Sequence, residues 1–186
     1  MNTLVFDWET TGLPLHDAAP LDKQPRGIEF GAVLLDADGN ELEAASLLIN
    51  PGHPLDPVIT KITGLTDDDL RDAPRIAEVM PQIVRLFSSA QLAIAHNLAF
   101  DKSILKFELA RLAITDFPWP PHELCTVEAH IASWGRRPKL QELYLAVMGE
   151  QLAQTHRALD DARALAHIVV VLGLHKNAEP SPNDAT

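Results

Sequence analysis

The sequence predicts a mixed α/β domain built on a five-stranded sheet with flanking helices. Two apolar runs of strand length, residues 28–35 and 41–50, flank a turn-rich segment at 36–40, as in a β-hairpin. A third apolar run at 3–6 completes an antiparallel meander at the N-terminus. Later in the chain, apolar residues recur at helical spacing between two more short apolar runs. This order of strands and helices is typical of a mixed sheet covered by helices.

The remaining elements follow from the same periodicities. After the meander we expect, in chain order, a helix over 74–87, a strand at 92–95, a helix over 100–112, a strand near 123–126 and helices over 140–148 and 158–172. Clusters of prolines separate several of these elements, and each cluster predicts a loop, because Pro lacks a backbone donor and restricts the residue before it. We find no internal repeat. Residues 1–174 are therefore expected to form one domain, and the polar segment 175–186 a disordered tail.

Composition narrows the class of protein. The chain has 186 residues, 15 of them basic and 26 acidic, and a net charge of −11. This balance argues against a protein that binds polyanions through a positive surface field. A single cysteine, Cys125, excludes an internal disulfide framework and a cysteine-based zinc cluster. Early acidic residues and the lack of a long apolar run predict a cytoplasmic protein with no membrane partner.

Four carboxylates stand at the ends of predicted elements. Asp7 and Glu9 end the first strand and, being two apart, point to the same face. Asp101 lies in the first turn of the helix after the 92–95 strand, and Asp161 opens the last long helix, close to His156. Taken singly, each acidic residue also fits a solvated strand end or a helix-capping charge, and His156 a loop histidine.

Taken together, these groups point to metal chemistry. Four clustered carboxylates carry a charge of −4, which two divalent cations with oxygen ligands would neutralise. Two such cations beside a base are the usual apparatus for in-line attack on a phosphodiester. The negative net charge is then no objection, since bound metal rather than a basic surface attracts the substrate phosphate.

At these residues the sequence resembles the histidine branch of the DEDD superfamily of 3′–5′ exonucleases (DEDDh), in the style of the proofreading subunit of bacterial DNA polymerase III. The matching motifs are FDWETTGL at 6–13, HNLAFD at 96–101 and HRALDDA at 156–162, with IEFGAV at 28–33 and the stretches 49–51 and 62–66 between them. The resemblance runs from Leu4 to about Leu172. His156 lies five residues before Asp161, the spacing of the histidine branch, and the sole tyrosine, Tyr144, is far from this register.

The resemblance implies a ribonuclease H-like fold and two divalent metal ions, Mg²⁺ or Mn²⁺. It implies that Asp7, Glu9 and Asp161 hold one metal, that Asp7 bridges to the second, and that Asp101 contributes directly or through water. His156 would be the general base, because neutral imidazole accepts a proton near neutral pH.

The resemblance also implies substrate contacts. The backbone at Thr10 would meet the terminal 3′-OH together with Glu9, Leu13 would wedge against the last base, and Asn97 and Phe100 would line the pocket. Leu13 and Phe100 equally fit ordinary core packing. The segment 134–139 holds three positive charges beside Trp134, which could steer a phosphate backbone or form a solvated loop.

The function expected from the sequence is therefore metal-dependent removal of nucleotides from the 3′ end of nucleic acid. DNA with a single-stranded or frayed end is favoured as substrate, and a DNA polymerase is a candidate partner. Trimming of RNA or short oligonucleotides is the alternative, because no residue visibly decides discrimination at the 2′-OH. A non-catalytic binding module on the same fold is disfavoured, since all five catalytic positions carry the required residue types.

Overall fold

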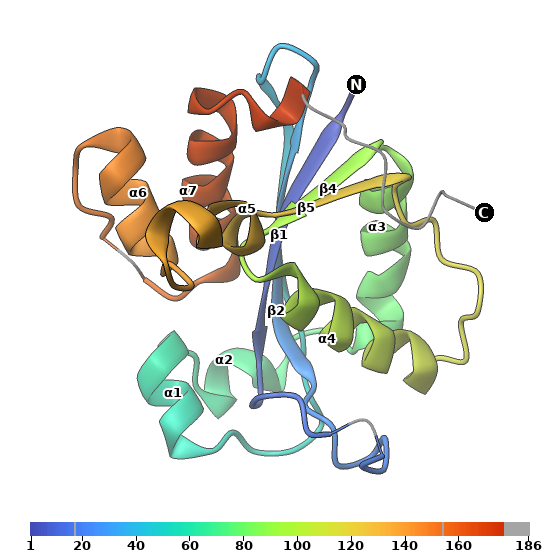
Figure 1. The fold of residues 1–186 in the computed structure, drawn as a ribbon. Coiled ribbons are helices and arrows are strands. Elements are labelled where there is room, and N and C mark those ends of the chain that lie inside the picture. Colours follow the sequence, from blue (N-terminus) through green and yellow to red (C-terminus); the bar gives the residue numbers. More distant parts are fainter. Residues whose placement is uncertain (17, 154, 177–186) are drawn as a thin grey trace.

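The sheet of this protein has five strands in the order β3-β2-β1-β4-β5 (Figure 1). The computed structural model describes residues 1–16, 18–153 and 155–176. The strands are β1 (Thr3–Thr10), β2 (Gly27–Leu35), β3 (Glu41–Leu48), β4 (Leu92–Ala95) and β5 (His122–Cys125). The first three pair antiparallel, and β4 and β5 add parallel to β1. The predicted meander and mixed five-stranded sheet are thus confirmed.

Helices cover both faces of the sheet (Figure 1). The helices are α1 (Pro57–Thr63), α2 (Asp67–Arg71), α3 (Ile76–Ser88), α4 (Leu98–Arg111), α5 (Thr126–Trp134), α6 (Leu140–Met148) and α7 (Ala158–Val171). Side chains of α3 and α4 pack on one face of the sheet, and those of α6 and α7 pack on the other. Because successive strand residues point to opposite faces, Phe6 joins the first core and Val5 the second.

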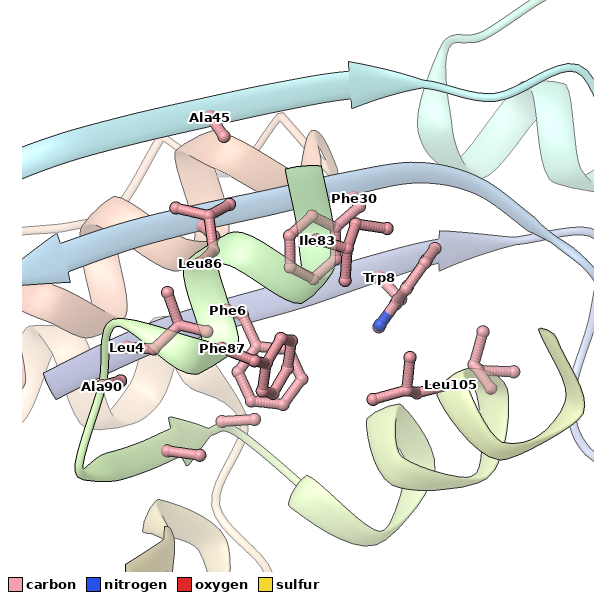
Figure 2. Close-up of a cluster of buried hydrophobic side chains, with 14 of the residues drawn as sticks. Leu4, Phe6, Trp8, Phe30, Ala45, Ile83, Leu86, Phe87, Ala90 and Leu105 are labelled. Atoms are coloured by element: carbon pink, nitrogen blue, oxygen red, sulfur yellow. The ribbon is translucent and has the colours of Figure 1, made fainter. Parts of the chain in front are cut away.

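Aromatic rings fill the core under α3 and α4 (Figure 2). The ring of Trp8 lies 4.8 Å from that of Phe30, and the ring of Phe6 lies 5.1 Å edge-on to that of Phe87. Trp8 is 2% exposed, so the residue between Asp7 and Glu9 anchors β1 in this core. The acidic residues beside it consequently face the α7 side of the sheet.

Some element boundaries differ from the sequence-based expectation. β1 continues to Thr10, so Asp7 and Glu9 lie within a strand, because pairing with β2 extends along its whole length. Helices α1, α2 and α5 were not expected. The first begins with Pro57, which fits the first turn of a helix, and the second is started by a capping box between Thr66 and Asp69.

The C-terminal end of the described chain also differs. His175 and Lys176 were assigned to the tail, but they belong to the 3₁₀ turn η1 (Leu174–Lys176), in which His175 is buried. The rest of the predicted tail, 177–186, lies outside the described residues. Among the residues that the structure describes, every helix is too short or too polar to cross a membrane.

Candidate active site

β1 and β2 place three carboxylates side by side. Asp7 pairs with Gly31 across the antiparallel ladder, and Glu9 pairs with Glu29. Strand alternation directs Asp7, Glu9 and Glu29 to the face covered by α7. Glu29 is fully buried and Glu9 partly so.

α7 reaches this face through an unusually close backbone contact. A Cβ atom at Gly31 would lie only 2.1 Å from the carbonyl carbon of Ala158, in the first turn of α7. Only glycine allows strand and helix backbones to approach this closely. One turn further on, Asp161 is 7% exposed and lies against the carboxylates of β1.

Asp101 comes to the same site from α4. Asn97 takes a left-handed conformation, with φ of 71°, and turns the chain from β4 into that helix. Asp101 is 1% exposed and accepts a hydrogen bond of 3.1 Å from the backbone N–H of Trp8. The carboxylate of α4 is thereby fixed on β1, between the positions of Asp7 and Glu9.

The clustering changes how these acids titrate. Burial raises the pKa of Asp7 well above its usual range, and Asp101, Glu9 and Asp161 raise it further. The pKa of Asp101 is also raised well above its usual value, chiefly by burial. Burial, followed by the charge of Asp161, raises the pKa of Glu9 to about 8. In the absence of a cation, such a cluster therefore retains protons at neutral pH.

The donor set fits a divalent cation. Glu9, Asp161 and His156 each offer a ligand atom, and these atoms lie within 4.8 Å of one another. Carboxylate oxygens suit hard cations such as Mg²⁺ and Mn²⁺. A cation would also relieve the mutual repulsion that raises the pKa of Glu9.

A cleft of about 600 Å³ opens over the cluster. Its acidic wall carries Asp7, Asp161 and the exposed His156. The facing wall is formed by residues of the β4–α4 turn, of α5, of the segment leading into α6 and of the first turn of α6, namely His96, Asn97, Val127, Arg137, Pro138, Lys139, Leu140 and Gln141.

The basic loop 134–139 is anchored beside this cleft. His96 Nε2 donates to the carbonyl of Pro138 over 3.1 Å, and burial lowers the pKa of His96 to about 4, so its ring stays neutral. Arg137 donates to the side-chain oxygen of Asn97 over 2.7 Å and to Glu128 over 2.6 Å. The loop thus brings one arginine to the wall of the cleft.

Arg136 is directed elsewhere. Its guanidinium forms a fork with Glu142, with bonds of 2.8 and 2.7 Å, and it lies 5.5 Å over the ring of Trp134. It does not line the cleft, whereas Arg137 does. Neighbouring arginines in the sequence therefore have different surroundings in the structure.

Comparison with known proteins agrees with this arrangement. The RNase T family model, described as an exonuclease, matches residues 4–169. The epsilon subunit of DNA polymerase III from Treponema pallidum is 32% identical over 172 residues, which cover 91% of this chain and 75% of that protein. The chain belongs to the DEDDh family of 3′–5′ exonucleases.

Other relatives of this DEDDh exonuclease are longer proteins. A Mycobacterium tuberculosis protein named as a bifunctional exonuclease/endonuclease is 34% identical over 189 residues, and the match spans 95% of this chain but 28% of that protein. The match to a PolC-type DNA polymerase III from Caldanaerobacter subterraneus, 31% identical, spans 90% of this chain but 11% of that protein.

Solved structures share the fold. The nuclease domain of 3′hExo, a DEDDh family member bound to rAMP, superposes with a TM-score of 0.74 at 17% identity and covers 97% of this chain and 94% of that chain. Exonuclease X, in complex with 5′-overhanging duplex DNA, gives a TM-score of 0.69 at 22% identity, with 96% of both chains covered.

Only one of the four substrate-contact residues expected in this DEDDh exonuclease lines the cleft. This residue is Asn97, whose side-chain oxygen accepts a hydrogen bond from Arg137. Thr10 is buried and its hydroxyl donates to the carbonyl of Gly12 over 2.7 Å. Leu13 is 79% exposed and therefore no core residue, whereas Phe100 is partly buried against the aromatic core. Thr10, Leu13 and Phe100 do not line the cleft.

Sequence reasoning missed two residues that shape the site, Glu29 and Gly31. A signal was present, because Gly27–Leu35 is an apolar strand that is buried at every position, interrupted by one charge and one internal glycine. A carboxylate in a strand whose two faces are both buried requires hydrogen-bond or charge partners. A glycine inside a strand often marks a close approach of another backbone segment.

Proposed function

We propose that this exonuclease removes nucleotides from the 3′ end of DNA, with two divalent cations, Mg²⁺ or Mn²⁺, held by Asp7, Glu9, Asp101 and Asp161, and with His156 as general base. The observation that carries this proposal is the clustering of carboxylates from β1, α4 and α7 beneath one cleft, which Asp7, Asp161 and His156 line. Their raised pKa values support cation binding, because cations would replace the retained protons.

Each side chain has a distinct task in this proposal. Asp7, Glu9 and Asp161 would hold one cation, and Asp7 and Asp101 would contribute to the second. The N–H of Trp8 holds the carboxylate of Asp101 beside β1. When bound, such cations supply Lewis-acid charge that offsets the charge of the phosphodiester in the transition state. His156 stands at the exposed side of the cluster, where it can accept the proton of the attacking water.

DNA is the proposed substrate because several relatives are named as DNA polymerase III proteins. A specific observation also favours the alternative, RNA trimming, since the nuclease domain of 3′hExo has the same fold and is bound to rAMP. A polymerase subunit is the proposed partner on the same grounds as DNA. Gel filtration of the chain with a DNA polymerase III catalytic subunit tests that partnership, and separate elution would contradict it.

The substrate test uses 5′-labelled oligonucleotides of one sequence, as single-stranded DNA, duplex DNA with a mismatched 3′ end, and RNA. We expect a ladder of products shortened from the 3′ end, highest kcat/KM for DNA, and no cleavage in excess EDTA. Higher kcat/KM for RNA would make the alternative correct. Full activity after exhaustive chelation would overturn the two-metal mechanism.

A further inference from the structure

One buried carboxylate at the site has no task in the proposed chemistry. Glu29 is 0% exposed and accepts four hydrogen bonds. Arg157 donates to it from Nε and Nη2, both over 2.9 Å, while Ala158 N–H donates over 3.2 Å and the hydroxyl of Ser46 over 3.0 Å.

These contacts exclude Glu29 as a fifth metal ligand. Its Oε1 accepts from Ser46 and Arg157, and its Oε2 accepts from Arg157 and Ala158. A carboxylate offers about four lone-pair sites, so both oxygens are fully used. The charge of Glu29 raises the pKa of Glu9, and Arg157 partly offsets this effect.

The partner of Glu29 lies directly after the proposed general base. His156 has a φ of 50°, a left-handed conformation that a residue with a side chain adopts only when its surroundings impose it. Arg157 is the N-cap of α7 and its own side chain makes no capping bond. Glu29 takes that place by accepting from Ala158 N–H, so the residues after His156 are tied to β2 by both backbone and side chain.

We propose that Glu29 and Arg157 are positioning residues that hold the ring of His156 over the carboxylate cluster. The proposal rests on the proposed function, because it takes His156 as the base. Neither residue lines the cleft, so neither is expected to touch the substrate. The fork geometry matters here, since lysine keeps the charge of Arg157 but cannot make the paired N–H bonds.

The test is a double-mutant cycle between the pair and His156. Replacing both partners, Glu29→Gln with Arg157→Gln, avoids leaving a buried unpaired charge. We expect kcat to fall about 10- to 100-fold in the wild-type background and less than about 2-fold when His156→Ala is already present. KM and the Mg²⁺ concentration for half-maximal activity should not change. Arg157→Lys, as a second and milder variant, should show part of the same loss.

Arg163 is the matched control, because it lies on the same helix and pairs with Glu41 at the surface over 3.4 Å. Arg163→Gln should keep wild-type kcat. An equal loss with and without His156, or a changed Mg²⁺ requirement, would overturn the positioning role.

Failure of the proposed function would look different. His156→Ala alone would then cost less than about tenfold in kcat. In that case the fixed position of His156 would be measured by its NMR backbone order parameter. We expect this order parameter to fall from about 0.85 to below about 0.6 in the variant that carries both Glu29→Gln and Arg157→Gln. An unchanged order parameter would contradict the proposal whatever the activity.

Discussion

Asp160 and Asp161 are adjacent acids with opposite surroundings. Asp161 is buried against the cluster, whereas Asp160 is exposed and accepts a hydrogen bond of 2.7 Å from the hydroxyl of Thr155. The difference arises because consecutive residues of a helix point about 100° apart. Only one of the two acids can therefore face the carboxylates of β1.

This contrast gives a direct mutational test. Asp161→Ala should lower kcat/KM by more than about 10³-fold, since the residue would hold a catalytic cation. Asp160→Ala should keep at least about a third of the wild-type value and is the matched control. Circular dichroism would verify that both variants fold. Equal losses in two folded variants would show that the register assigned to Asp161 is wrong.

The neighbours Arg136 and Arg137 allow a second matched test. Arg137 lines the cleft, so Arg137→Ala should raise KM for a single-stranded oligonucleotide about 3- to 30-fold. It should also reduce the salt dependence of binding by about one phosphate contact. Arg136→Ala removes the same charge from a residue held by Glu142 and should change KM less than about 2-fold. Similar KM values for both variants would place the substrate backbone elsewhere.

At the scale of elements, the site depends on how closely α7 approaches β2. The first turn of the helix lies directly on Gly31, and this contact sets the depth at which Asp161 meets Asp7 and Glu9. The contact involves backbone atoms on both sides. A flexible side chain therefore cannot move aside to make room for a substituent.

Gly31→Ala should displace the N-terminus of α7. We expect the free energy of unfolding to fall by about 1–3 kcal/mol, as in other overpacked cores, and kcat to fall more than about tenfold. Urea denaturation and steady-state kinetics would measure the two effects. Gly12→Ala serves as the stability control, because a Cβ there meets no atom within 4 Å. Wild-type stability and kcat in Gly31→Ala would show that the helix position is not critical.

At the scale of the whole molecule, the carboxylate cluster couples folding to pH and metal. The pKa of Glu9 rises from 4.5 to about 8 on folding without a cation, so the folded state binds a proton that the unfolded state has lost between these values. The free energy of unfolding therefore decreases as pH rises through this window, by on the order of 1 kcal/mol per pH unit. The buried Asp7 and Asp101 act in the same direction.

We accordingly expect Tm in EDTA to fall between about pH 5 and 8, and the fall to be shallower in Glu9→Gln. Saturating Mg²⁺ should raise Tm most at the upper end of this range, because the cation binds only the folded, deprotonated cluster. Differential scanning calorimetry at several pH values tests both effects. A Tm in EDTA that is constant over this range would contradict the raised pKa of Glu9.

Much of the fold and the candidate site could be predicted from the sequence by itself. The bounds of β4 and α6 agree with the expected 92–95 and 140–148, since β4 is a continuous apolar run and α6 has apolar residues at helical spacing. The helices α1 and α2 were missed because seven and five residues contain too few turns for a period to stand out. The helix α5 is as long as α6, but only Thr126 and Val127 of it are buried, so it has no continuous apolar face. The five residues Asp7, Glu9, Asp101, His156 and Asp161 were selected by motif spacing, which is local information.

Only the tertiary structure decided what surrounds those residues. Glu29 and Arg157 are 128 positions apart, and nothing in the local pattern of either segment indicates that they pair. The same holds for the contact of Gly31 with α7 and for the choice of Arg137 over Arg136 at the cleft. Periodicity and motifs indicate which residues face a core or carry chemistry, because both are properties of short segments of the sequence. Long-range pairs depend on how distant elements approach one another, and that approach is set by packing of the whole domain.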